Sequence, residues 1–410
     1  MSHAAQLLVS MLDELGHITD EPGRLTRTFL SPAMRHANRL VGDCMNAAGL
    51  EVREDSVGNL IGHAAAANPK AKTLLLGSHL DTVRDAGRFD GPLGVLLPIV
   101  ALAELKVRGV KLPFNVEVLG FSEEEGVRFA SAYLGSEGYT GRLKENTLKL
   151  TDADGITVRQ TLEEFGGKFV LPRPAHKRGD LLGYVEVHIE QGPVLEAKKL
   201  AVGVVSAIAG QSRFKLTWTG KAGHAGTTPM ALRRDALAGA AEFIVGVEAI
   251  ARRRPGLVAT VGALTVSPGA ANVIPGSVVH TLDVRHAKDS VRRAALMEIG
   301  RLATQIADRR RLQRRWQRTQ ENGAVACSPA LTTALERSVK AVQGRSLSLV
   351  SGAGHDGVVM SSLTPVAMLF VRCRDGLSHH PDEYAAPKDL AVALAVMTDF
   401  LERLAKDHRR

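Results

Sequence analysis

The stretch Leu74–Gly94 reads LLLGSHLDTVRDAGRFDGPLG and joins an apolar run to residues of metal-binding type. The run is typical of a buried strand, and it breaks at Gly77. His79 and Asp81 come next, and Asp90 follows from a polar loop. If the strand continues, His79 and Asp81 share one face, so Asp81 can accept the imidazole N–H that a metal-bound histidine leaves free. Three such residues also occur in ordinary solvated loops, so the interpretation depends on partners elsewhere in the chain.

Polar residues also occur at the ends of two further apolar runs, Phe114–Phe121 and Tyr184–Ile189, and in a segment near the C-terminus. The residues concerned are Glu123, Glu124, Glu125, His188, Glu190, Gln191, His379 and His380. Three adjacent carboxylates directly after buried residues repel one another, and this costs free energy unless a cation compensates. Each segment alone is weak, but the four together predict a metal site at the ends of neighbouring strands.

Short motifs extend this pattern along most of the chain. In order they are GSHLDTV, GRFDGPLGV, SEEEGVRF, HIEQGPVLE, GHAGTTPM, ANVIPG, DVRH, SGAGHDG and LSHHPDEY, covering His79 to Glu383. They resemble the amidase/carbamoylase branch of the M20 metallopeptidase family. That branch includes N-carbamoyl-L-amino-acid hydrolases, β-ureidopropionases and allantoate amidohydrolases.

The resemblance implies a dinuclear metal centre with two divalent ions per chain. The residues that match the family's ligands are His79, Asp90, Glu125, His188 and His379. Asp90 would bridge the two ions, while His79 and His188 would each bind one of them. His379 is preferred to His380 because the family places its ligand directly after the serine. Nitrogen and oxygen ligands without thiolates suit zinc, with manganese, cobalt or nickel as alternatives.

The resemblance also assigns catalytic roles to carboxylates. Glu125 directly precedes Gly126, as the family's ligand does, which leaves Glu124 as the general base. Metal coordination lowers the pKa of water to about 7, so a metal-bridging hydroxide exists at neutral pH. Glu124 would take a proton from this water as it attacks the substrate carbon, and would pass it to the leaving nitrogen. Asp81 would support catalysis by orienting His79.

Further residues match substrate-binding positions of relatives, namely Gln191, His224, Asn272, Arg285 and His355. His224 and Asn272 would stabilise the oxyanion, and Gln191 would contact the ureido or amide group. Arg285 would hold a substrate carboxylate through a planar two-pronged contact. Without the resemblance, His224 is interpreted as a loop histidine and Asn272 as a turn former. Arg285 is then a surface arginine that pairs with Asp283 or Asp289. Gly357 stands where relatives often have alanine, a conservative change that should reshape the pocket only slightly.

The length of 410 residues favours two domains. Residues 211–325 carry strand and helix patterns in the order βαββαβ, including a strand over 257–266, and contain no metal-ligand cluster. We therefore expect an α/β protein whose mixed-sheet catalytic domain, 1–210 and 326–410, is interrupted by an α+β domain at 211–325. In the family the corresponding domain is a lid that carries the dimer interface, so the resemblance implies a homodimer.

Composition places the chain among soluble globular proteins. Hydrophobic residues make up 45% and the mean hydropathy is −0.01. We find neither a secretory leader pattern nor an apolar run of the ~20 residues that a membrane span needs. Cys44, Cys327 and Cys373 are far apart and odd in number, which indicates neither a disulfide framework nor a thiolate metal site. A cytoplasmic protein without membrane contact is expected.

The net charge of +9 raises the question of nucleic-acid binding. The densest basic run is Arg309–Arg318, RRRLQRRWQR, at the end of a helix-like amphipathic segment. No nucleic-acid motif accompanies it, so we interpret it mostly as a solvated face. The helical pattern before it covers Lys288–Ala307, and Arg314 onward is expected to form a last strand.

The sequence thus predicts a metal-dependent amidohydrolase that cleaves a linear C–N amide or ureido bond of a small carboxylate-bearing substrate. N-carbamoyl-L-amino acids and allantoate are favoured, followed by ureidoglycolate and β-ureidopropionate. A dipeptidase or aminoacylase of the wider family is the alternative, and hydrolysis of a dipeptide but no ureido compound would favour it. A metal-stabilised binding protein without turnover is a further alternative, but binding alone does not require a base at Glu124.

Overall fold

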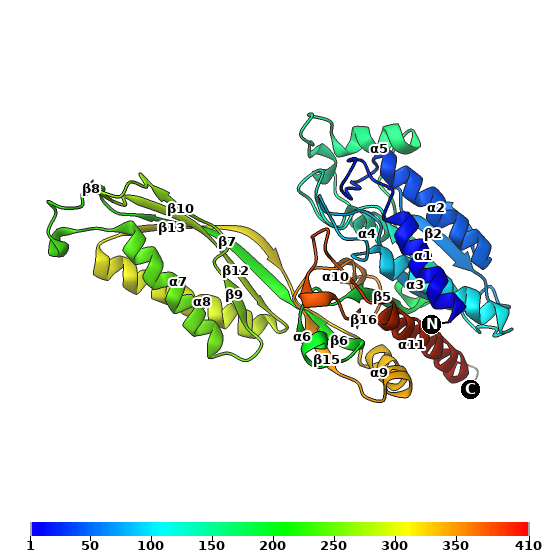
Figure 1. Ribbon diagram of the computed structural model, residues 1–410. Coiled ribbons are helices and arrows are strands. Elements are labelled where there is room, and N and C mark those ends of the chain that lie inside the picture. Colours follow the sequence, from blue (N-terminus) through cyan, green and yellow to red (C-terminus); the bar gives the residue numbers. More distant parts are fainter. Residues whose placement is uncertain (1, 409–410) are drawn as a thin grey trace. The chain divides into compact units, whose positions relative to one another are not determined.

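The computed structural model describes residues 2–408, and the chain forms two compact units (Figure 1). Unit 1 comprises Met1–Ser206 and Ala326–Arg410, and unit 2 comprises Ala207–Val325. The sequence analysis placed the first boundary after residue 210, inside the strand with which unit 2 begins its sheet. Within the described residues no helix combines the length and apolar character needed to span a bilayer.

Unit 1 contains a sheet in the order β1-β2-β4-β3-β5-β16-β6-β14, with β15 paired to β6. Its strands are β1 (Glu51–Glu54), β2 (Leu60–Ala64), β3 (Thr73–His79), β4 (Asn115–Phe121), β5 (Leu181–Ile189), β6 (Val202–Ile208), β14 (Val325–Ala326), β15 (Ser348–Ser351) and β16 (Val366–Val371). The neighbours β4, β3, β5 and β16 run parallel, whereas β1, β2 and β6 pair antiparallel. The predicted mixed sheet is therefore confirmed.

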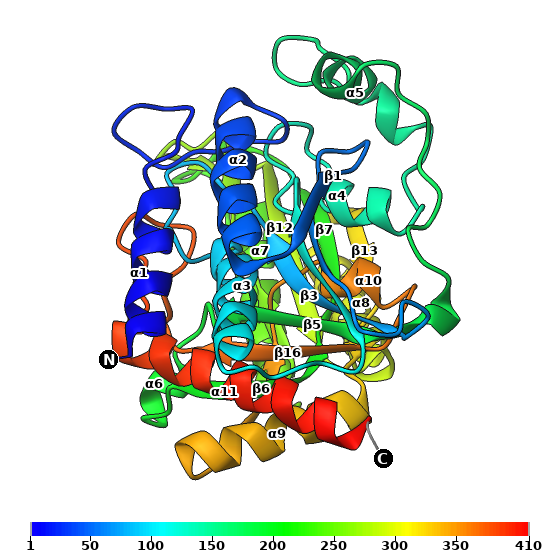
Figure 2. The same cartoon turned by 90° about the vertical axis from the view of Figure 1, so that its right-hand side faces the viewer.

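Helices cover this sheet, and the most buried of them lies at its centre. They are α1 (His3–Leu15), α2 (Pro32–Ala48), α3 (Pro92–Val107), α4 (Leu134–Tyr139), α5 (Val158–Gly166), α6 (Val194–Ala197), α9 (Pro329–Gln343), α10 (Gly357–Met360) and α11 (Pro387–Asp407). All residues of α3 from Pro92 to Leu102 are buried. A helix that is apolar all round must be covered on every side. Accordingly α3 packs on β3, and α1, α2 and α11 pack against α3 (Figure 2).

Unit 2 is an α+β layer with its own core. It contains β7 (Gly210–Thr219), β8 (Gly223–His224), α7 (Ala236–Arg252), β9 (Val258–Thr260), β10 (Leu264–Ser267), β11 (Val273–Ile274), β12 (Ser277–His286), α8 (Asp289–Arg310) and β13 (Gln313–Asn322). The sheet order is β10-β12-β7-β13, with β9 also paired to β12. The side chains of α7 and α8 that face the sheet form one buried cluster with Leu216, Trp218 and Leu282 of its strands.

The single strand expected over 257–266 is wrong, because the structure has two short strands there. β9 pairs with β12 at Asp283–Arg285, and β10 pairs with it at Ser277–His280. Between them the Ala263 N–H donates to the Thr281 hydroxyl at 3.1 Å instead of to a ladder carbonyl. Gly262 adds no side chain that could pack in the interruption.

The basic run spans the end of one helix and the start of the last strand of unit 2, close to where the sequence analysis expects that strand. α8 ends at Arg310, Arg311 adopts a left-handed φ of 55°, and β13 begins at Gln313. The run therefore divides between a helix end and a strand. Arg309 and Arg310 both form ion pairs with Glu242 of α7, the second at 2.7 Å. These two arginines thus share one carboxylate within unit 2.

The close approach of α3 to the sheet generates a test. A Cβ on Gly94 would lie 2.3 Å from the Val187 carbonyl oxygen and 2.6 Å from Ser78 Cβ. We predict that Gly94→Ala lowers the free energy of unfolding by about 1–3 kcal/mol, the usual cost of overpacking. In the control Gly166→Ala nothing lies within 4 Å of the added Cβ, so stability should hold or rise by up to about 1 kcal/mol. Denaturant titration measures both, and equal stabilities would contradict the tight packing of α3.

Candidate metal centre

Parallel strands deliver the site residues to one edge of the unit 1 sheet. His79 is the last residue of β3 and pairs with Phe121, the last residue of β4. His188 lies next to the end of β5, opposite Phe370 of β16. Because the carboxyl ends of parallel strands share one edge, the loops that follow them meet there.

Asp90 lies at the centre of the resulting cluster. Its Oδ1 is 3.0 Å from His188 Nε2 and 3.7 Å from His79 Nε2. Its Oδ2 is 3.2 Å from His379 Nε2, which is 3.4 Å from Glu125 Oε1. The structure thus brings together the five residues that the sequence analysis named as ligands.

These residues fall into two groups that share Asp90. His79, Asp90 and His188 form one group, and Asp90, Glu125 and His379 form the other; within each, the ligand atoms lie within 4.8 Å of one another. Imidazole nitrogens and carboxylate oxygens at such spacing fit a divalent transition metal, so the donor set fits the expected ions. His79 and Glu125 also form a group with Glu124. The expected general base therefore lies beside two of the expected ligands.

The backbone around the cluster is constrained. Gly91 has a φ of 84°, and a Cβ there would lie 2.5 Å from the His79 ring, so only glycine can follow Asp90. His379 and Gln191 adopt positive φ values of 57° and 54°. For residues other than glycine this conformation costs of order 1–3 kcal/mol, and such strain gathers at functional sites.

Asp81 connects His79 to the adjacent glutamates. Its Oδ1 accepts the Glu124 N–H at 2.9 Å, and its Oδ2 accepts the Glu125 N–H at 3.1 Å. His79 Nδ1 is 3.3 Å from Asp81 Oδ1 and 3.0 Å from the Asp81 carbonyl oxygen. Asp81 therefore orients the imidazole and the backbone of the glutamate pair together.

The electrostatics of the cluster show a surplus of buried carboxylates. Burial, and then the neighbouring Glu125, raise the pKa of Glu124 well above its ordinary value. Burial and Asp90 raise the pKa of Glu125 to about 7. Burial also acts to raise the pKa of Asp90, but His188 and His379 outweigh it and hold that pKa well below the usual range. A divalent cation would relieve this repulsion.

His355 is buried against His188 and is not exposed at the surface of the site. It is 1% exposed, its ring meets that of His188 edge-on with centroids 4.5 Å apart, and its Nε2 is 2.7 Å from Ser351 Oγ. Burial and His188 lower the pKa of His355 well below its ordinary value, so this histidine is neutral. A substrate contact by His355 stays a prediction.

The other three expected substrate residues belong to unit 2. His224 pairs with Val273 across β8 and β11, and the Ala225 N–H donates to the Asn272 carbonyl at 2.9 Å. The exposed His224 and Asn272 are thus neighbours on a two-stranded ribbon. Arg285 contacts the Asp283 carboxylate through Nε and Nη2, each at 2.9 Å. The structure therefore shows the ion pair between Arg285 and Asp283 that the sequence analysis gave as the alternative to a substrate contact.

The sequence analysis missed two residues of the centre, Ser378 and Glu383. Ser378 Oγ lies 2.6 Å from Asp90 Oδ2, and Glu383 Oε1 accepts the N–H groups of Phe89 and Asp90. Both stand in the LSHHPDEY motif that supplies His379. Their position in the same motif as the ligand His379 could have indicated a role in the site. A short sequence motif does not reveal, however, which distant backbone groups they contact.

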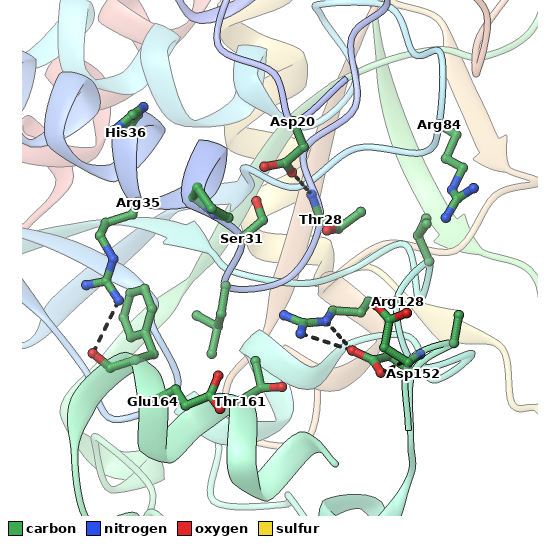
Figure 3. A pocket seen from close by; sticks show the side chains of 16 residues that line it. Asp20, Thr28, Ser31, Arg35, His36, Arg84, Arg128, Asp152, Thr161 and Glu164 are labelled. Carbon is green, nitrogen blue, oxygen red and sulfur yellow. Dashed lines mark hydrogen bonds and ion pairs between the residues drawn. The ribbon is translucent and has the colours of Figure 1, made fainter. Parts of the chain in front are cut away.

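A separate hollow of about 720 Å³ opens beside α2 and α5 (Figure 3). Its charged lining consists of Asp20, Arg35, His36, Arg84, Arg128, Asp152, Asp154 and Glu164. Arg128 pairs with Asp152 at 3.0 Å, and Arg35 stacks on Phe165 with 4.1 Å between its guanidinium carbon and the ring centroid. Two of the three arginines are thus engaged within the protein, and none of the expected site residues lines the hollow.

Comparisons with known proteins cover most of the chain. The model of peptidase family M20/M25/M40 matches residues 75–403. Allantoate deiminase 2 of Glycine max is 41% identical over 97% of this chain and 89% of its own. An N-carbamoyl-L-amino acid amidohydrolase of Geobacillus stearothermophilus is 42% identical over 96% of this chain and 97% of its own. A crystal structure of a hydantoinase/carbamoylase family amidase from Burkholderia multivorans superimposes with a TM-score of 0.93, 33% identity and 98% coverage of both chains.

The shared position of Asp90 leads to a prediction about metal content. The wild-type chain should bind up to two divalent ions, and Asp90→Ala should lose more than one because its carboxylate serves both groups. Elemental analysis after metal loading and desalting measures the stoichiometry. Asp154→Ala, which removes an exposed carboxylate of the separate hollow, is the control and should bind like the wild type. Two ions retained by Asp90→Ala would refute the ligand assignment.

Proposed function

The chain belongs to peptidase family M20/M25/M40 and is a hydrolase of carbon–nitrogen bonds other than peptide bonds, and from that premise we propose its substrate class and mechanism. The proposed reaction is hydrolysis of a linear ureido or amide bond in a small carboxylate-bearing molecule, either allantoate or an N-carbamoyl-L-amino acid. The names of relatives that match over nearly the whole chain support these substrates. The observation that carries the proposal is the cluster of nitrogen and oxygen ligands around Asp90, in which His79, Asp90 and His188 are buried and His379 is exposed.

We propose two divalent ions per chain, one for each group that shares Asp90. Zinc suits the ligands, and manganese, cobalt and nickel are the alternatives. Bound ions would lower the pKa of water to about 7 and polarise the scissile carbonyl.

Glu124 is the proposed general base. It lies beside His79 and Glu125, and its backbone is fixed by the hydrogen bond from its N–H to Asp81 Oδ1 at 2.9 Å. It would accept a proton from the attacking water and deliver it to the leaving nitrogen.

Gln191 is proposed to bind the ureido or amide group. Its Nε2 donates to Asp90 Oδ2 at 2.9 Å and to Ser378 Oγ at 3.2 Å, which fixes the direction of the side-chain amide. Its Oε1 is buried and has no hydrogen-bond partner within residues 2–408. A buried acceptor of this kind favours a ligand N–H as its partner. Arg285, whose guanidinium Asp283 already orients, is proposed to bind the substrate carboxylate.

The proposed substrate class is tested by one screen of the metal-loaded protein. Allantoate, N-carbamoyl-L-amino acids of different size and dipeptides are supplied in parallel, and ammonia or amino-acid release is measured. We expect turnover of a ureido compound, and Glu124→Gln should keep its metal but lose about 10²-fold or more of the activity. Cleavage of dipeptides alone would instead identify a dipeptidase or aminoacylase. Loss of metal from Glu124→Gln would mean that Glu124 and Glu125 exchange roles.

We further propose that the protein is a homodimer formed through unit 2. The edge strand β10 and its neighbour β9 leave Leu264 42% and Val258 57% exposed, and on α8 Met297 is 62% exposed. Exposed strand edges and apolar side chains favour pairing with a second copy. A two-fold axis would then allow His224 and Asn272 of one chain to complete the site of its partner.

Subunit exchange tests this composite site. Glu124→Ala and His224→Ala should each be nearly inactive alone. In a mixed dimer with composite sites, one site carries both substitutions and the other carries none. Each mixed dimer should therefore show up to about half of the activity of a wild-type dimer. Exchange is verified with differently tagged chains. If exchange occurs without recovered activity, His224 does not act across the dimer.

A further inference from the structure

Glu383 is a buried carboxylate whose partners all belong to the metal centre. It is 4% exposed and follows His379 on the loop after β16. Its Oε1 accepts the backbone N–H of Phe89 at 3.0 Å and that of Asp90 at 3.1 Å. Its Oε2 lies 3.0 Å from Ser378 Oγ. Two backbone N–H groups therefore donate to Oε1, which offsets part of the cost of burying the carboxylate.

Ser378 continues these contacts to the side chain of Asp90. Its Oγ lies 2.6 Å from Asp90 Oδ2, and it also accepts from Gln191 Nε2 at 3.2 Å. A hydroxyl has one proton, so Ser378 donates either to Asp90 or to Glu383. In both cases its oxygen lies between the two carboxylates and sets their separation.

The contacts join parts of the chain that are distant in sequence. The hydrogen bond from Asp90 to Glu383 spans 293 residues, and that from Ser378 to Asp90 spans 288. Glu383 fixes the backbone of Asp90, and Ser378 contacts its carboxylate. The loop that supplies His379 therefore also determines where the shared carboxylate lies.

We propose that Glu383 and Ser378 are positioning residues for Asp90, and that the affinity for both metal ions depends on them. This inference rests on the metal centre proposed above. Carboxylate ligands are usually held by hydrogen bonds, and loss of such a partner costs about 10–100-fold in metal affinity or activity. Because Asp90 belongs to both ligand groups, its displacement weakens both.

Glu383→Gln tests whether Glu383 acts by accepting hydrogen bonds or through its negative charge. The carbonyl oxygen of the glutamine accepts both backbone N–H groups, and its amide donates to Ser378 Oγ, so the Ser378 proton remains available to Asp90. Leucine at 383 removes every acceptor. Ser378→Ala removes a single hydroxyl and is the variant least able to disturb folding. Asp382→Ala, at an exposed carboxylate with a side chain 77% exposed on the same loop, is the matched control.

The experiment measures metal binding without turnover. Metal-free protein is titrated with zinc against a chromophoric chelator, and the visible absorption of the cobalt-loaded protein reports the coordination. Glu383→Gln and Asp382→Ala should bind like the wild type. Glu383→Leu and Ser378→Ala should bind both ions about 10–100-fold more weakly and change the cobalt spectrum.

Thermal unfolding of the metal-free variants separates folding from positioning. Wild-type affinity in Ser378→Ala would overturn the proposal, whether or not Glu383→Leu folds. Equal loss in Glu383→Gln and Glu383→Leu would also overturn it, because charge and not acceptor geometry would then be required. A wild-type chain that binds no divalent ion would instead refute the metal centre of the proposed function.

Discussion

Repulsion among buried carboxylates is the constraint on which the unit 1 site depends. Asp81, Asp90, Glu123 and Glu124 are each at most 9% exposed, and they lie close to one another at the end of one sheet. Histidines hold Asp90 ionised, while burial and like charges push the pKa of Glu124 and Glu125 upward. Such an arrangement is costly for an empty scaffold and suitable for divalent cations.

The scaffold keeps these groups in place through contacts that are independent of any ion. From Pro92 to Leu102 α3 is apolar and buried, and it packs against the parallel strands β3 and β5 that carry His79 and His188. Asp81 ties His79 to the glutamate pair, and Glu383 ties the Asp90 backbone to the loop of His379.

The residues proposed to carry the chemistry belong to both units. Unit 1 contains the ligands and the proposed base, whereas the exposed His224 and Asn272 lie on the β8–β11 ribbon of unit 2. Metal binding and oxyanion stabilisation can therefore be tested by separate variants. The proposed substrate contacts likewise come from both units, Gln191 from unit 1 and Arg285 from unit 2.

The sequence by itself determined the features that depend on local pattern. Apolar runs predicted β3, β4 and β5, and the polar residues after them predicted the cluster, because parallel strands end at one edge. Only the tertiary structure decided which residues of distant segments meet. Glu383 and Ser378 contact Asp90, and the buried Arg27 donates to the Leu80 carbonyl at 2.6 Å. The break between β9 and β10 likewise follows from a partner on another strand, since the Thr281 hydroxyl replaces a ladder carbonyl as the acceptor of the Ala263 N–H. Such contacts escape sequence patterns because a hydrogen bond is specified by positions in space and not by spacing along the chain.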